Sequence, residues 1–233
     1  MGDEANDAPK KAHYVGHRER LKQRFTNHGA DSLQDYELLE LLLTYAIPRR
    51  DVKEDAKNLL ADFGGISDVL TADIHKLTKQ KGIGEHSAIL LKVVEAAALR
   101  LSQHKVLDQP ILSNWQALLN YCQAAMAHKK IEQFRVLFLD NRNRLIKDEC
   151  LQQGTVNHTP VYPREVIRRA LDLHASAIIL VHNHPSGDAT PSRDDIEMTK
   201  KIARIGQELG VAVHDHLIIA KSGHNSFKSL GLL

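Results

Sequence analysis

The pattern of apolar and polar positions divides the chain into two parts. Over residues 16–101 the apolar side chains recur at helical spacing, and helix-breaking residues fall between the helical stretches. One stretch shows signals for both ends of such a helix, because Asp51 and Glu54 have the spacing of a capping box and Gly64-Gly65 supplies the stop. The first part is therefore predicted to be all helical.

The second part mixes the periods of helices and strands. The expected elements, in order, are a helix over 114–128, a strand over 134–139, a turn over 140–143 leading to residues 145–146, a strand over 147–152, a helix from Pro163, a buried strand over 176–181, a helix over 192–209 and a final strand over 211–220. The turn over 140–143 indicates a hairpin. The fold class is therefore predicted as α/β, more closely α+β, with an all-helical domain ahead of a mixed one.

Breaks in these patterns set the expected domain boundaries. Residues 1–15 are polar and small, with no face to bury, and we expect a disordered lead-in. The sequence turns polar over residues 102–110 and then reaches a proline, which indicates a linker. We expect a helical domain over 16–105 and a second domain over 113–233.

Composition narrows the function classes. The 233 residues are 26% charged and carry a formal charge of +2, as in ordinary globular proteins. No apolar stretch approaches the roughly 20 residues of a membrane helix, and no apolar signal core opens the chain, so we expect a cytoplasmic protein without membrane contact. Cys122 and Cys150 are too few for an all-cysteine metal site, so any metal must be held by histidines and carboxylates. We expect Trp115, Tyr121 and Cys122 in the core, and Cys150 as a buried thiol.

A pair of histidines ends the buried strand over 176–181. Strand side chains alternate in direction, so His182 and His184 project to one face and could reach a single ion. With 14 histidines in the chain, such a pair also arises by chance. His214 and His216 have the same spacing with no ligand-bearing loop after them, and we expect no function from that second pair.

The segment after the first pair strengthens the metal interpretation. A glycine and two prolines shape a loop over residues 185–191, which could fold back so that Asp195 in the next helix faces the histidines. Two imidazoles and a carboxylate with a fourth position for water are typical of a catalytic zinc site. Ser192 and Asp195 also form a helix N-terminal cap, which needs no metal. Spacing alone leaves both interpretations open.

The same residues resemble a known signature. The segments 182–187 and 191–195 together resemble the JAMM (MPN-plus) metallohydrolases, and the bacterial RadC family in particular. The resemblance covers nearly the whole chain. The further matching segments are Tyr162-Pro163-Arg164-Glu165-Val166, Asp215-His216, Ser226-Phe227, Gly16-His17-Arg18-Glu19-Arg20 and Asp35-Tyr36-Glu37-Leu38-Leu39.

The resemblance implies a JAB/MPN mixed-sheet domain and a role for each site residue. The zinc ligands would be His182, His184 and Asp195, with one Zn²⁺ per chain, and Ser192 would help to hold the oxyanion. Glu132 is the best match to the family's catalytic glutamate, and the alternatives are Glu149 and Glu165. Since Glu165 lies at the start of a predicted helix, it also suits a dipole or cap role.

These roles imply zinc-dependent hydrolysis of an amide bond in a peptide or protein that the sequence does not specify. The alternative function is that of a DNA-binding or DNA-repair-associated accessory protein, in which the metal is structural or acts on phosphodiesters. Gly82 and Gly84, between two predicted helices, resemble a helix-hairpin-helix that offers backbone amides to a phosphate. Lys79 and Lys81 would add charge, and an ordinary turn between packed helices would look similar.

Overall fold

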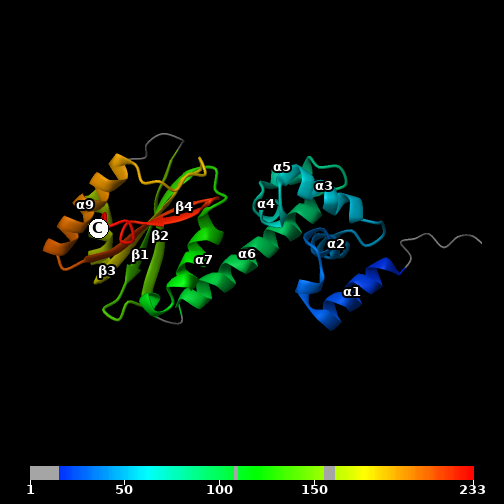
Figure 1. Cartoon of the computed structure of the whole chain (residues 1–233), viewed down its shortest axis with the longest axis horizontal. Helices are drawn as coiled ribbons and strands as arrows, with labels where there is room; N and C mark the ends of the chain where they lie inside the picture. Colours follow the sequence, from blue (N-terminus) through cyan, green and yellow to red (C-terminus); the bar gives the residue numbers. More distant parts are fainter. Residues whose placement is uncertain (1–15, 108–109, 155–160) are drawn as a thin grey trace, which may run out of the picture. The chain divides into compact units, whose positions relative to one another are not determined.

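We describe a computed structural model of the chain over residues 16–107, 110–154 and 161–233 (Figure 1). The predicted lead-in, residues 1–15, lies outside the described residues. The chain forms two compact units that divide between Ala96 and Ala97. No helix of the described part is long and apolar enough to cross a membrane.

The first unit is helical, as the apolar periodicity predicts. Its elements are α1 (His17–His28), a short 3-10 turn η1 (Ala30–Ser32), α2 (Asp35–Ala46), α3 (Lys53–Phe63), α4 (Ile66–Thr71), α5 (Ile74–Thr78) and the first half of α6 (Glu85–Leu107). Buried leucines of α2, α3, α5 and α6 form the main core, which includes Leu39, Leu43, Leu59, Leu77 and Leu91.

Two predictions for this part of the chain are wrong. The capping box at Asp51 does not form, because the Asp51 carboxylate accepts the N–H of Lys53 at 3.0 Å and leaves Val52 as the N-cap residue. Glu54 pairs with Lys57 instead. The linker expected over residues 102–110 is helical as far as Leu107, because α6 continues without a break through this polar stretch. The helix end predicted at Gly64 is confirmed, and this glycine has a φ of 106°.

The second unit is built on one mixed sheet of five strands in the order β2-β1-β3-β4-β5. The strands are β1 (Glu132–Leu139), β2 (Leu145–Gly154), β3 (Ala177–Asn183), β4 (Ala212–Ala220) and β5 (Gly223–Ser226). All neighbours are antiparallel except β3 and β4, which run parallel. A parallel pair needs a crossover, and α9 (Arg193–Glu208) supplies it.

Helices cover both faces of the sheet (Figure 1). Alternate side chains of β1 and β3, such as Leu137 and Ile179, pack with α7 (Trp115–Met126), which follows a 3-10 turn, η2 (Ile111–Ser113). The intervening side chains, such as Phe138 and Leu180, pack with α8 (Pro163–Asp172) and α9. Both faces are therefore apolar, which explains why β3 is buried along its whole length.

The structure confirms the α+β class and the predicted hairpin, with three corrections. The strand expected over residues 147–152 is the continuation of the hairpin's second strand, β2. A short strand, β5, follows the strand predicted to be the last. Cys150 is exposed, because β2 lies at the edge of the sheet, whereas Trp115, Tyr121 and Cys122 belong to the core as predicted.

Candidate metal centre

The end of β3 brings the first candidate ligand to the α9 face of the sheet. His182 lies opposite Phe134 of β1 and is 1% exposed. Its ring stacks on Phe134 with 6.3 Å between ring centroids. His184 follows the last strand residue, but its N–H still donates to the Ile219 carbonyl of β4 at 2.8 Å. The strand direction therefore extends far enough to aim both imidazoles to one side, as the alternation predicts.

The loop after His184 is fixed by hydrogen bonds. Gly187 takes a φ of 91° and donates its N–H to the His184 carbonyl, which turns the chain. The carboxylate of Asp188 accepts from the backbone N–H of Thr190 at 2.9 Å. The Asn225 side chain of β5 donates to the Ala189 carbonyl, also at 2.9 Å. These bonds set where α9 begins.

In the first turn of α9, Asp195 is both a helix-capping residue and a candidate metal ligand. Ser192 is the N-cap residue, and its hydroxyl accepts the Asp195 N–H at 3.1 Å while the Asp195 carboxylate accepts the Ser192 N–H at 2.8 Å. The predicted capping box is confirmed. The cap leaves Asp195 directed toward β3, so the cap orients the carboxylate as a ligand rather than competing with that role.

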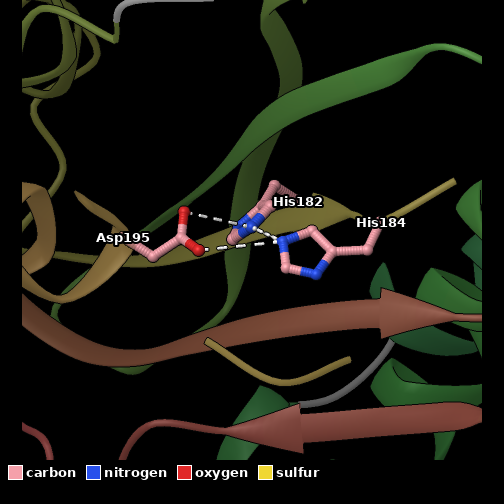
Figure 2. Close-up of side chains that lie close together, drawn as sticks. All are labelled: His182, His184 and Asp195. Atoms are coloured by element: carbon pink, nitrogen blue, oxygen red, sulfur yellow. Dashed lines mark hydrogen bonds and ion pairs between the residues drawn. The ribbon is translucent and has the colours of Figure 1, made fainter. Parts of the chain in front are cut away.

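Three ligand atoms converge at this place, as Figure 2 shows. The Nε2 atoms of His182 and His184 are 2.9 Å apart, and they lie 3.3 and 3.7 Å from the two carboxylate oxygens of Asp195. Tetrahedral coordination at about 2.0–2.1 Å separates ligand atoms by about 3.3 Å. The donor set of two imidazoles and one carboxylate also suits zinc, so these residues fit a zinc ion.

Charge interactions within this group are strong. Burial opposes ionisation of Asp195, but hydrogen bonds with His182 and His184 outweigh it and hold the pKa of the Asp195 carboxyl well below its usual range. The hydrogen bond with Asp195 in turn raises the pKa of His184. The carboxylate is therefore negative and attracts a cation to this point.

Comparisons with known proteins agree with the geometry. A family model described as the RadC-like JAB domain matches residues 112–232, and one described as UPF0758 N-terminal matches residues 13–89. A UPF0758 protein from Rhodobacter capsulatus is 56% identical over 213 residues, which are 91% of this chain and 100% of that protein. The chain belongs to the RadC family. The JAB match contains all three converging ligands and relates the sheet unit to the JAMM family in general.

Glu132 begins β1 of this RadC-family chain, on the same side of the sheet as the ligands. Phe134 lies opposite His182 in the antiparallel pair, so Glu132, two residues earlier, shares its face and lies toward His184. Glu132 is half-buried, and its charge contributes to the raised pKa of His184. Its predicted catalytic role stays a prediction.

The two alternatives to Glu132 make ion pairs with arginines. The Glu149 carboxylate accepts both Nε and Nη2 of Arg169, at 2.7 and 2.5 Å, and this hydrogen bonding lowers its pKa. Glu165, in the first turn of α8, pairs with Arg168 at 2.8 Å. Neither carboxylate is held toward the ligands by these contacts, and Glu165 has the helix-start position that was expected.

The two histidines of the second pair have different surroundings. The pairing of β3 with β4 skips His214, which interrupts the alternation of β4. His214 contacts the Asn143 side chain at 2.6 Å, whereas His216 is fully buried and lies 2.8 Å from Nδ1 of His182. The structure therefore places His216, but not His214, against a candidate ligand.

The spacing of residues within β4 gives no signal for the contact between His216 and His182, because that contact depends on the register between two strands. The one available signal is the Asp215-His216 match in the family resemblance. Asp215 is buried and accepts hydrogen bonds from the His216 N–H, the Lys228 N–H and the Ser226 hydroxyl. It therefore ties β4 to the C-terminal segment and fixes the backbone of His216.

The predicted helix-hairpin-helix lies in the other unit, between α5 and α6. Gly82 has a φ of 86°, and its carbonyl accepts Nη2 of Arg50 at 2.7 Å. Gly84, Lys79 and Lys81 are exposed. The turn is thus held by Arg50, from the loop before α3, and its lysines are exposed.

Proposed function

We propose that this RadC-family protein is a metal-dependent amide hydrolase of the JAMM type, with zinc as its metal. The observation that carries the proposal is the convergence of His182, His184 and Asp195 from a strand end and a helix start. Three protein ligands leave a tetrahedral ion one further position, as in catalytic rather than structural zinc sites. When bound there, zinc would supply an acidified water and an electrophile for a carbonyl.

Glu132 is the proposed general base. A carboxylate on this face can take a proton from the attacking water at one oxygen and later deliver it to the nitrogen of the leaving amine. Glu132 lies at the start of β1, two residues before the first buried residue of that strand, Phe134. Its half-buried carboxylate therefore has access to a substrate. Glu149 is less suited, because its ion pair with Arg169 already occupies both carboxylate oxygens.

Ser192 is the proposed donor to the developing oxyanion. Its hydroxyl now donates to the Asp195 carboxylate at 2.6 Å and accepts the Asp195 N–H. The donated proton can rotate toward a substrate oxygen while the accepted bond, and therefore the helix cap, persists. A donor placed in advance at this point stabilises charge in the transition state. The substrate class that follows is a peptide or isopeptide amide.

Zinc content of the purified protein tests the metal part of the proposal. We expect about one zinc per chain in the wild type, loss of zinc in Asp195→Ala, and retention in Asp194→Ala. Asp194 is the matched control because it is an exposed carboxylate in the same first turn of α9. A wild type that binds no zinc after reconstitution, or an Asp195→Ala protein that binds it fully, would contradict the proposal.

Hydrolysis tests the catalytic part. We expect Glu132→Gln to keep its zinc and lose cleavage of a peptide and isopeptide library, measured by mass spectrometry. Glu149→Gln and Glu165→Gln are the controls and keep both. If Glu132→Gln cleaves as the wild type does, the assignment of the base is wrong. Cleavage of a phosphodiester but of no amide would instead favour the alternative chemistry on DNA.

The helical unit supports a second proposal, contact with the DNA backbone. The exposed lysines Lys79 and Lys81 lie just before the glycines of the turn that leads into α6, an arrangement in which backbone amides and lysines can both reach a phosphate. The salt dependence of duplex binding tests it, since each phosphate contact adds to the slope.

A further inference from the structure

A buried histidine lies directly beneath the candidate metal centre. His216 is fully buried, and its ring stacks on Phe227 with 4.5 Å between ring centroids, while Phe134 packs edge-on at 5.8 Å. Its two ring nitrogens each have one partner in this apolar enclosure. Nε2 lies 2.8 Å from Nδ1 of His182, and Nδ1 lies 2.6 Å from the Thr199 hydroxyl. Each of these short contacts needs one donor and one acceptor.

The Thr199 hydroxyl fixes the direction of the whole chain of hydrogen bonds. Thr199 lies in α9, and its hydroxyl donates to the carbonyl of Asp195, four residues earlier, at 2.5 Å. Because a hydroxyl has one proton and a carbonyl can only accept, the oxygen of Thr199 must accept from His216. Nδ1 of His216 therefore carries the proton, and Nε2 of the neutral ring is an acceptor.

The same logic then assigns His182. Its Nδ1 faces an acceptor and must carry a proton, so Nε2 is the nitrogen left to bind a metal. His184 reaches the same state by a different route, since its Nδ1 faces the Asp188 carbonyl at 2.7 Å and can only donate. The two Nε2 atoms thus face each other at 2.9 Å, beside the Asp195 carboxylate. Without a metal this short contact needs a proton on one of the two Nε2 atoms, and a bound cation would take the place of that proton.

We infer that His216 and Thr199 are positioning residues that preset the tautomer and orientation of His182 for binding a metal. The inference rests on the proposed metal site and extends it into the core. Metal-ligating histidines commonly donate their second N–H to a carboxylate or a carbonyl. In this chain the acceptor for His182 is another imidazole, whose own tautomer is set by a hydroxyl on the helix that carries Asp195. The two ligands are therefore coupled through Thr199.

Zinc affinity tests the inference. Thr199→Val removes the hydroxyl at nearly constant shape, and Thr199→Ser restores it. Partners of this kind typically contribute about 10–100-fold to metal affinity, so we expect that loss in Thr199→Val and recovery of most of it in Thr199→Ser. Affinity is measured by competition with a chromophoric chelator, after circular dichroism shows that each variant is folded. Equal affinities of Thr199→Val and the wild type would overturn the inference.

A second measurement needs no variant. In the metal-free wild type labelled with ¹⁵N-histidine, two-dimensional NMR distinguishes a protonated Nδ1 from a protonated Nε2 in each ring. We expect His182, His184 and His216 all to carry a proton on Nδ1. An unprotonated Nδ1 of His182 would overturn the inference. If the wild type bound no zinc, the proposed function would fail, and this spectrum would still decide the inference by itself.

Discussion

Two loops of this protein lead into long helices and contain a glycine with positive φ, yet they differ in what surrounds them. The loop over residues 184–192 precedes α9, and the turn over residues 79–84 precedes α6. After the first loop, Asp195 meets two imidazoles from the sheet. In the second, the carbonyl of Gly82 is held by Arg50, which also pairs with Asp55 of α3 at 2.6 Å.

The difference separates a site from a packed turn. At Gly187 a β-carbon would meet nothing within 4 Å, so packing does not account for the glycine there, and only its φ requires it. At Gly82 a β-carbon would overlap the Arg50 and Asp55 side chains. Ligands from another element converge on the start of α9, whereas close packing accounts for the glycine before α6.

The largest expected effect concerns two histidines, His184 in the loop before α9 and His86 in the first turn of α6. We expect His184→Ala to reduce bound zinc from about one per chain to background, because two remaining ligands hold the ion poorly. His86→Ala removes an exposed imidazole from the first turn of α6 and should leave zinc content unchanged. Elemental analysis of both proteins measures this. Equal zinc content in the two variants would contradict the assignment of the metal site to the loop before α9.

A smaller effect is expected from replacing the glycines themselves. Gly82→Ala combines a left-handed backbone with displacement of the Arg50–Asp55 pair, and we expect a loss of about 2–3 kcal/mol in the free energy of unfolding. Gly187→Ala has the backbone strain alone, for which we expect about 1 kcal/mol. Urea denaturation of both variants gives the difference. A greater loss for Gly187→Ala would mean that the loop before α9 is the more tightly packed one.

The sequence could predict the parts of the site that are local. Alternation within a strand placed His182 and His184 on one face, and cap spacing placed Asp195 at a helix start. His216 could not be found in this way, because its contact with His182 depends on the parallel register of β3 with β4 and on the residue that this register skips. Thr199 could not be found either, because its contact with His216 depends on how α9 packs against β4. The same limit applies to Glu132, whose position follows from the pairing of β1 with β3.

The helices and strands could likewise be predicted from the sequence only in part. Long periodic stretches gave the helices and the core strands correctly. The polar residues at the end of α6 have no apolar periodicity, so the helix that continues through them could not be distinguished from a linker. The four residues of β5 are too few to show alternation, and they are ordered by pairing with β4.

The dual role of Ser192 gives a further test of the loop before α9. Ser192→Ala removes the N-cap hydroxyl, and we expect it to lower the free energy of unfolding by about 1 kcal/mol. Zinc should remain bound, because the Asp195 carboxylate still accepts the Ser192 N–H and keeps its direction. Hydrolysis, in contrast, should fall. A variant that loses zinc together with the cap would mean that the hydroxyl is needed to hold Asp195 as a ligand.

The smallest effect is expected at the turn before α6, where the lysines decide whether it is more than a packed turn. If Lys79 and Lys81 each contact a phosphate, replacing either by alanine should lower the salt slope of duplex binding by about 0.9. Lys200→Ala removes an exposed lysine of α9 and should leave the slope unchanged.

Glu85, in the first turn of α6, repels phosphate, so Glu85→Gln should strengthen binding slightly. Fluorescence anisotropy of a short labelled duplex across a salt series measures the wild type and all four variants. Equal slopes would show that Gly82 and its neighbours serve packing alone, and the contrast between the two helix entries would then be complete.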